Sequence, residues 1–161
     1  MKNHSSLVLS ELISAAHIKL NLAGTTSDAV LAELVGQIPE IANKPEARQT
    51  LLTALQERER LHSTGIGDGV ALPHARNALV GLVERPVIVF ARHPKGIEYG
   101  AIDGTPARLF FLLVAPTVTL HLAVLARISR VLRDSKLRQD LLTADSGKQV
   151  VALIREVEEK V

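Results

Sequence analysis

Two mainly apolar runs constrain the fold of this chain more than any other feature. They are Pro86–Ala91 (PVIVFA) and Ala107–Ala115 (ARLFFLLVA). Strands of this composition are apolar on both faces, so we expect them to lie in a sheet that helices cover on both sides. The segment Ile97–Ala101 and the turn Asp103-Gly104 stand between the runs. They predict a further strand pairing.

Other segments before the apolar runs predict helices and one strand. Leu7–Ala16 has a short helical pattern, and His17–Leu22 alternates polar and apolar residues as a half-buried strand does. A second helix is expected over Ala29–Ile38, where Thr25 and Asp28 have the spacing of a capping box. Pro39 closes this helix.

A third helix is expected from Pro45 to about Arg60, with Pro45 near its first turn. From Val118 the apolar period is again helical, and the polar breaks Asp134–Lys136 and Asp145–Gly147 divide this tail into about three helices. The order of the elements predicts a single α/β domain over residues 1–161, with the sheet covered on both faces.

Composition excludes several classes of function. The chain has 161 residues and no cysteine, which excludes disulfides, thiolate metal sites and cysteine nucleophiles. A net charge of +2 and 2% aromatic residues argue against nucleic-acid binding. Leu109–Ala126 lacks charged residues, but Pro116 interrupts it, so it predicts a strand, a turn and a helix start rather than a membrane span. No signal peptide is expected, because Met1–Ser6 is polar and Glu11 interrupts the apolar stretch that follows.

The glycine-rich segment Ser63–Arg76 (STGIGDGVALPHAR) is the main candidate for a functional site. Three alternating glycines precede a short apolar run, Val70-Ala71-Leu72, which predicts a brief buried strand. Pro73 and His74 follow directly. Proline fixes its own backbone angle and favours an extended residue before it. The segment therefore predicts an imidazole held rigidly at the end of a short strand.

Helical spacing predicts that Arg58 and His121 point inward. Arg58 continues the apolar stripe of Leu51 and Leu55 at the C-terminal end of its helix. Its neighbours Glu57, Glu59 and Arg60 are expected on more solvent-exposed faces of the same helix. His121 shares a stripe with the apolar positions Leu125, Ile128 and Leu132. Both polar residues stand near element ends, where a cleft can open.

Together, His74, His121 and Arg58 suit the binding and transfer of a phosphoryl group. Neutral imidazole is abundant at pH 7 and can attack phosphorus to form a covalent bond. A guanidinium supplies a planar cationic donor, and a second imidazole can donate a hydrogen bond. The hydroxyls of Ser63 and Thr64 and the amides of the glycine-rich turn offer further contacts.

The residues also permit plainer interpretations. An inward histidine such as His121 is often a core residue, and Arg58 can pair with Glu57 at the surface. A metal hydrolase using His62, His74 and His121 is a third hypothesis, but no H-E-x-x-H motif supports it, and no metal or cofactor is expected. The remaining histidines are expected at the surface: His4, His17, His62 and His93.

The sequence resembles a known family along nearly its whole length. STGIGDGVALPHAR, GIEYGAIDGTPARLFFLLVAP and HLAVLARISRVLRD are similar to the enzyme IIA domains of the fructose, mannitol and nitrogen-regulatory class of the bacterial phosphotransferase system. The resemblance implies a three-layer α/β/α sandwich with a small mixed sheet. It implies phosphoryl acceptance on Nε2 of His74, with Arg58 supporting the phosphoryl group and His121 completing the site. The connection from Pro116 to His121 is shorter than in many relatives, which bears on the position of His121.

The resemblance further implies two partners and leaves two functions open. The chain would receive a phosphoryl group from an HPr-like carrier and pass it to a IIB component in fructose- or mannitol-type sugar uptake. Alternatively, its phosphorylation state would regulate binding to transporters or kinases, as expected for a nitrogen-regulatory module. The sequence shows no fused HPr, IIB or membrane component, which is the motive for this alternative. Either function is expected in the cytoplasm, without membrane insertion, and Arg76 is a candidate for partner docking.

Overall fold

The computed structural model describes residues 8–75 and 81–161. Within these residues, one mixed five-stranded sheet has the order β1-β4-β5-β3-β2. Parallel pairing joins β1 to β4 and β3 to β5, whereas β4 with β5 and β2 with β3 are antiparallel. The strands are β1 (Ile18–Lys19), β2 (Gly65–Gly67), β3 (Val70–Ala71), β4 (Val87–Ile97) and β5 (Ala107–Val114).

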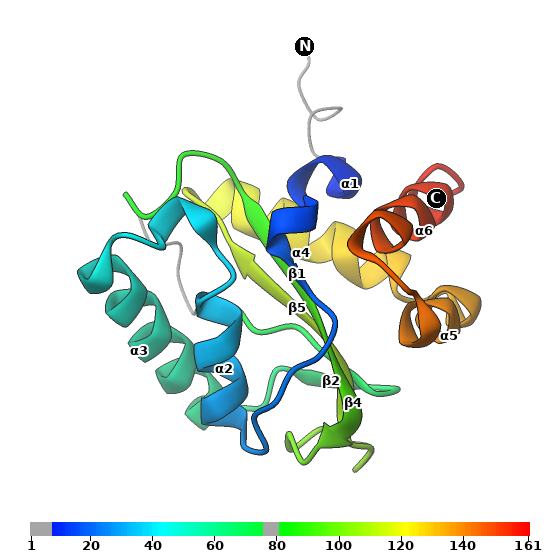
Figure 1. Cartoon of the computed structure of the whole chain (residues 1–161), viewed down its shortest axis with the longest axis horizontal. Helices are drawn as coiled ribbons and strands as arrows, with labels where there is room; N and C mark the ends of the chain where they lie inside the picture. Colours follow the sequence, from blue (N-terminus) through cyan, green and yellow to red (C-terminus); the bar gives the residue numbers. More distant parts are fainter. Residues whose placement is uncertain (1–7, 76–80) are drawn as a thin grey trace.

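Helices cover both faces of the sheet, as Figure 1 shows. One face carries α2 and α3, and the other carries α4, α5 and α6. The α-helices are α1 (Leu9–Leu12), α2 (Ser27–Val35), α3 (Pro45–Leu61), α4 (Val118–Val131), α5 (Ser135–Thr143) and α6 (Gly147–Glu158). Two 3-10 turns are η2 (Ala15–His17) and η3 (Pro39–Ile41). The predicted α/β/α sandwich is therefore confirmed.

Alternating side chains of the two long central strands fill two separate cores. Val89 of β4 and Leu112 of β5 pack in the core beneath α2 and α3. Phe90 and Phe111 point to the opposite core with α4, α5 and α6, where their ring centroids lie 5.0 Å apart. Both strands are therefore buried on both faces, as their composition predicted.

The predicted helix starts are mostly confirmed. Pro45 occupies the first turn of α3, where its missing amide hydrogen costs no helical hydrogen bond. Asp134 and Ser146 cap α5 and α6 with their side chains, in the two breaks expected from the sequence. The prediction for α2 was wrong by one residue, because the hydroxyl of Thr26, rather than Thr25, accepts from the amide of Ala29.

Three other predicted elements are shorter than expected. Of the helix predicted over Leu7–Ala16, residues 8–16 contain the four-residue α1 and the start of η2, and Leu7 lies outside the described residues. In His17–Leu22, only Ile18 and Lys19 form a strand. No separate strand forms over Ile97–Ala101, because Ile97 is the last residue of β4 and pairs with Ala107. The register shift that precedes Ile97 lets β4 continue past Arg92 to this point.

The described residues contain no helix that is long and apolar enough to cross a membrane. The uncharged run Leu109–Ala126 divides between β5 and α4. Thr117 stands between them and caps α4, since its hydroxyl accepts from the amide of Leu120. The predicted strand, turn and helix start are confirmed.

Candidate functional site

His74 lies where the β3–β5 ladder ends. The carbonyl of Pro73 accepts from the amide of Leu113, and His74 forms a parallel bridge with Leu113. Pro73 has no amide hydrogen to donate, so the ladder can continue through its carbonyl alone. The backbone of His74 is therefore fixed to the central strand β5, as the sequence predicted for a residue at a strand mouth.

The imidazole of His74 is held by the backbone of the segment that follows β3. Its Nδ1 lies 2.6 Å from the carbonyl oxygen of Leu72. A carbonyl only accepts hydrogen bonds, so Nδ1 carries the proton in this contact. In the neutral ring, Nε2 then carries the free lone pair. The arrangement leaves a nucleophilic nitrogen on the side of the ring away from β3.

The ring of His121, a residue distant in the sequence, lies next to the ring of His74. It lies in the first turn of α4, and only 7% of its surface is exposed. The ring centroids of His74 and His121 are 5.4 Å apart, with the rings inclined at 61°. The Thr117 cap starts α4 directly after Pro116, so the short connection still brings the two histidines together. The inward orientation of His121 is confirmed.

Arg58 lies in the last turn of α3 and is partly buried. Its Nη1 donates to the carbonyl of His62, at 2.6 Å, across the end of the helix. The positive charge of Arg58 is close enough to His74 to lower the pKa of its imidazole. The structure therefore brings His74 and His121 together and places the charge of Arg58 within electrostatic reach of His74.

The two imidazoles are held in their neutral forms. Burial is the main cause that lowers the pKa of His74 below its ordinary value; the Leu72 carbonyl opposes this shift and Arg58 adds to it. Burial also lowers the pKa of His121, and the neighbouring His74 adds a smaller contribution. A neutral ring keeps its lone pair, so the electrostatics favour a nucleophile.

Ser63 and Thr64 lie in the turn between α3 and β2, and their hydroxyls have protein partners. The Ser63 hydroxyl donates to the carbonyl of Tyr99 and accepts from the amide of Gly65. Thr64 is 4% exposed, and its hydroxyl donates to the carboxylate of Glu59 at 2.8 Å. Support of a phosphoryl group by these two hydroxyls stays a prediction.

Glu59 is the residue of this region that the sequence reasoning missed. It was predicted on a wetter face, but the structure shows its carboxylate partly buried and bonded to Thr64. Burial raises the pKa of Glu59, against the lowering effect of the Thr64 hydrogen bonds. The signal was available: Glu59 stands four residues after Leu55, which is a buried position of α3.

Tyr99 closes the inner side of this region. It is 5% exposed and stacks edge to face on Phe110, with ring centroids 5.4 Å apart. Its hydroxyl lies 3.4 Å from that of Thr64. Burial, and after it the negative charge of Glu59, raises the pKa of Tyr99. Tyr99 is therefore a neutral phenol beside the Glu59–Thr64 contact.

The glycines of the segment make room for a neighbouring loop. A Cβ at Gly65 would lie 3.1 Å from the Cβ of Ala101, and one at Gly67 would lie 2.8 Å from Oδ2 of Asp103. Gly67 also has a φ of +90°, which residues with a side chain rarely adopt. These contacts explain the glycines through close packing between β2 and the loop that precedes β5.

Two of the four histidines predicted at the surface are buried. His93 is 6% exposed; its Nε2 donates to the carbonyl of Gly24 while Nδ1 accepts from the amide of Gly96. His17 is 9% exposed and bonded to Glu40. The prediction was wrong for these two because segments distant in the sequence cover them. His62 is exposed, whereas His4, like Arg76, lies outside the described residues.

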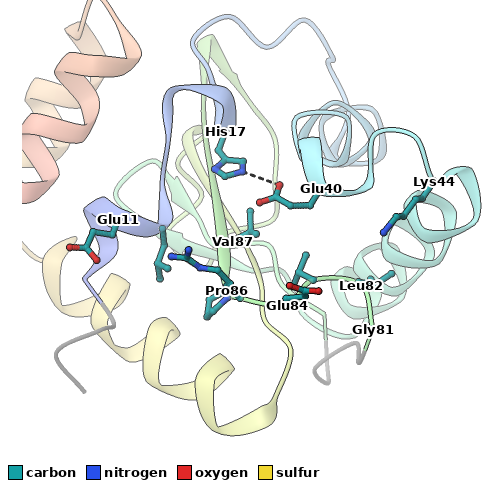
Figure 2. A pocket seen from close by; sticks show the side chains of 12 residues that line it. Glu11, His17, Glu40, Lys44, Gly81, Leu82, Glu84, Pro86 and Val87 are labelled. Atoms are coloured by element: carbon teal, nitrogen blue, oxygen red, sulfur yellow. Dashed lines mark hydrogen bonds and ion pairs between the residues drawn. The ribbon is translucent and has the colours of Figure 1, made fainter. Parts of the chain in front are cut away.

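A cavity of about 470 Å³ lies beside His17, away from the paired histidines. Figure 2 shows the His17–Glu40 contact, 3.1 Å from Nε2 to Oε1, at its wall. Lys44 and Glu84 also line it, as does Val87 at the start of β4. None of the five site residues predicted from the sequence, Arg58, Ser63, Thr64, His74 and His121, belongs to its lining.

The metal-hydrolase alternative finds no support in the geometry. Within residues 8–75 and 81–161, no group of three or more histidine and acidic side chains is arranged to hold a metal ion. His62 is exposed, and its backbone carbonyl accepts from Arg58.

Comparison with known proteins identifies the sequence family of the chain. The sequence model of the family described as "Phosphoenolpyruvate-dependent sugar phosphotransferase system, EIIA 2" matches residues 11–157. The matched range includes Arg58, His74 and His121. It covers the chain from α1 to within α6.

Curated relatives fall into two named groups. A fructose-specific EIIABC component of Bacillus subtilis is 35% identical over 150 residues, which are 92% of this chain but 23% of that protein. The chain thus spans about a quarter of that relative. A fructose-specific EIIA component of Haloferax volcanii is 37% identical over 73% of this chain and 76% of its own length. A nitrogen regulatory protein of Bradyrhizobium diazoefficiens is 30% identical over 91% of this chain and 94% of its own length.

Solved structures share the fold. Nitrogen regulatory protein IIA-Ntr of Neisseria meningitidis superposes with a TM-score of 0.78 at 28% identity, over 91% of this chain and 98% of that one. The mannitol enzyme IIA of Escherichia coli was solved in complex with phosphorylated mannitol enzyme IIB. It gives a TM-score of 0.75 at 22% identity, over 90% of this chain and 99% of that one. Since the family model covers most of the chain, the chain belongs to the EIIA 2 family of the phosphoenolpyruvate-dependent sugar phosphotransferase system.

Proposed function

We propose that this protein is a phosphocarrier that accepts a phosphoryl group on Nε2 of His74. The observation that carries the proposal is the contact between Nδ1 of His74 and the carbonyl of Leu72. It assigns the proton to Nδ1 and leaves the Nε2 lone pair free. The lowered pKa of His74 favours the neutral, nucleophilic ring.

The proposed step exchanges one bond to phosphorus for another. The Nε2 lone pair of His74 forms the new nitrogen–phosphorus bond, while the bond from phosphorus to the donor breaks and the donor keeps that electron pair. No proton has to leave His74, because its single proton stays on Nδ1 with Leu72. The reverse exchange onto an acceptor returns His74 to its neutral form.

Arg58 and His121 stabilise the transferred group in this proposal. The charge on a phosphoryl group in transfer is spread over its three peripheral oxygens, so fixed donors lower the barrier. Arg58 supplies a permanent cation near His74, and His121 supplies a ring at 5.4 Å. Ser63 and Thr64 support the site from the adjoining turn; direct contact with phosphate would require their hydroxyls to leave Tyr99 and Glu59.

Exposed apolar side chains near the site support protein partners as donor and acceptor. Val118 and Leu122 are 57% and 59% exposed, and they flank His121 on consecutive turns of α4. Leu61, at the end of α3 after Arg58, is 54% exposed. Large exposed apolar residues around a reactive group are typical of a protein-binding surface. We propose an HPr-like carrier as donor and a IIB component as acceptor.

Two comparisons support the IIB acceptor and the sugar-uptake pathway. The mannitol enzyme IIA with the same fold was solved with a phosphorylated IIB partner. Relatives at 35% and 37% identity are named fructose-specific components. We place the chain in the cytoplasm, where phosphoenolpyruvate is available as the ultimate phosphoryl source. No cofactor has a part in the proposed step.

A nitrogen-regulatory role is the second candidate. The nitrogen regulatory relative matches along 94% of its own length, and the Neisseria IIA-Ntr structure gives a TM-score of 0.78. In this role, the phosphate on His74 would control docking to a transporter or kinase. Neighbouring IIB and IIC genes would favour sugar uptake, whereas a neighbouring alternative sigma factor or carrier gene would favour regulation.

Mass spectrometry of the intact chain tests the proposal. Incubation with phosphoenolpyruvate, enzyme I and HPr should add one acid-labile phosphoryl group, and a purified IIB component should then remove it. Omission of HPr is the control and should leave the chain unmodified. A chain that stays unmodified in the complete mixture, with HPr from its own organism, would contradict the phosphocarrier role. Retention of the group in the presence of cognate IIB would favour the regulatory role.

A further inference from the structure

The Glu59 carboxylate is bonded to both donors of one residue. The amide of Thr64 lies 2.7 and 2.9 Å from the two carboxylate oxygens, and the Thr64 hydroxyl lies 2.8 Å from each. Hydrogen bonds to a charged acceptor are stronger than neutral ones, and Thr64 itself is buried. Glu59 therefore fixes the start of the segment that leads from α3 into the sheet.

A continuous path of hydrogen bonds leads from Glu59 to the ring of His74. The carbonyl of Thr64 accepts from the amide of Leu72 at 2.9 Å. The carbonyl of Leu72 then accepts from Nδ1 of His74 at 2.6 Å. We call these contacts of Glu59, Thr64, Leu72 and His74 the Glu59–His74 path. A shift of Thr64 would move Leu72, and with it the group that orients the imidazole.

Arg58 also contacts the turn between α3 and β2, but at a different residue. It donates to the carbonyl of His62, two residues before Thr64. Arg58 and Glu59 are consecutive residues, so the last turn of α3 contacts the turn at both His62 and Thr64. Of these two side chains, Glu59 is the one bonded to Thr64, whose carbonyl accepts from the amide of Leu72. The two side chains therefore have separable effects on His74.

We propose that Glu59 is a positioning residue for phosphoryl transfer, acting on His74 through Thr64 and Leu72. This inference rests on the function proposed above. Glu59 has no contact with the reacting nitrogen; it fixes the Leu72 carbonyl, which holds the proton of His74 on Nδ1 and aims Nε2. A nucleophile displaced by a fraction of an ångström reacts more slowly even when its chemistry is intact.

Three variants separate positioning from folding. Glu59→Gln keeps the size of the side chain but places an amide NH2 against a donor of Thr64. Glu59→Ala removes both acceptors, and Thr64→Ser preserves both donors as a conservative variant. Glu57→Gln is the matched control, since Glu57 is an exposed residue of the same helix.

The first readout does not depend on phosphoryl transfer. Nitrogen-15 NMR of the unmodified protein should show His74 as one tautomer, with its proton on Nδ1, in the wild type, Thr64→Ser and Glu57→Gln. In Glu59→Gln and Glu59→Ala, we expect a mixture of tautomers. Because this result requires no phosphorylation, a failure of the proposed function and a failure of the positioning role are distinguishable.

The second readout is the rate of phosphorylation by phosphorylated HPr. The rate should fall by about 10- to 100-fold in Glu59→Gln and more in Glu59→Ala, whereas the control Glu57→Gln should stay near the wild type. If Glu59→Ala does not fold, the isosteric Glu59→Gln variant decides alone. A folded Glu59→Gln protein with the wild-type tautomer and rate would overturn the proposal.

Discussion

The rings of His74 and His121 meet edge to face at 5.4 Å, although one follows a short strand and the other begins a helix. Two features of the backbone produce this meeting. The bridge to Leu113 fixes His74 at the end of β3, and the Thr117 cap starts α4 directly after β5. Since Leu113 belongs to β5, one strand positions both histidines. The site therefore depends on the centre of the sheet rather than on a flexible loop.

The pKa of His121 should respond to phosphorylation of His74. In the unmodified protein, burial holds the pKa of both histidines below the ordinary value of 6.5. A phosphoryl group on His74 brings negative charge beside His121 and favours its protonated form, so the pKa of His121 should rise. A carbon-13 NMR titration of both forms measures this change. An identical His121 titration in the two forms would contradict the proposed placement of the phosphoryl group.

Loss of Arg58 should slow phosphorylation without unfolding the protein. Arg58→Ala removes a cation near His74, and loss of one fixed donor to a transition state costs about 100-fold or more in rate. Arg58→Lys keeps the positive charge but loses the planar guanidinium donors, so its phosphorylation rate should fall between those of Arg58→Ala and the wild type. The exposed neighbour gives the control Arg60→Ala. Equal rates for Arg58→Ala and Arg60→Ala, measured with phosphorylated HPr, would exclude a role for the Arg58 charge.

Removal of the buried Glu158 carboxylate should destabilise the fold. Its Oε2 accepts from the amide of Leu9 at 2.6 Å and from Nε of Arg127 at 2.9 Å, which ties α1 and α4 to the end of α6. Glu158→Ala leaves these donors unpaired, and we expect a loss of about 1–3 kcal/mol in the free energy of unfolding. Urea denaturation measures it against Glu159→Ala, an exposed neighbour. Equal midpoints and slopes for both variants would show that the contact contributes nothing.

The close packing at Gly67 should tolerate no side chain. Gly67→Ala combines a positive φ with a Cβ only 2.8 Å from Oδ2 of Asp103. Gly104 also has a positive φ, +73°, but a Cβ there would have no neighbouring atom within 4 Å, so Gly104→Ala measures the backbone cost alone. Backbone strain of this kind costs about 1–3 kcal/mol. Thermal unfolding should show a larger loss for Gly67→Ala, and equal losses would argue against the contact with Asp103.

Much of the fold was predictable because its signals are local. The apolar runs that became β4 and β5, the proline that opens α3 and the caps of α5 and α6 all depend on neighbouring residues. His121 was predictable as well, because one apolar stripe of a long helix indicated its direction. These patterns need no knowledge of the rest of the chain.

The failed predictions concern side-chain contacts that helical spacing and composition do not specify. Glu59 and Arg58 both continue the buried stripe of α3, at four and three residues after Leu55, and spacing alone does not say that Thr64 would engage the carboxylate. His93 is buried because Gly24, far away in the sequence, accepts from its ring. The same is true of His17 and Glu40, which only the folded chain brings together.

The identity of the phosphorylated residue tests the central claim most directly. Wild type, His74→Ala and the control His62→Ala, which removes an exposed histidine, are each incubated with phosphoenolpyruvate, enzyme I and HPr, and the acid-labile phosphate is quantified. We predict equal labelling of the wild type and His62→Ala, and no labelling of folded His74→Ala. Wild-type labelling of His74→Ala would contradict the assignment of His74 as the phosphoryl acceptor.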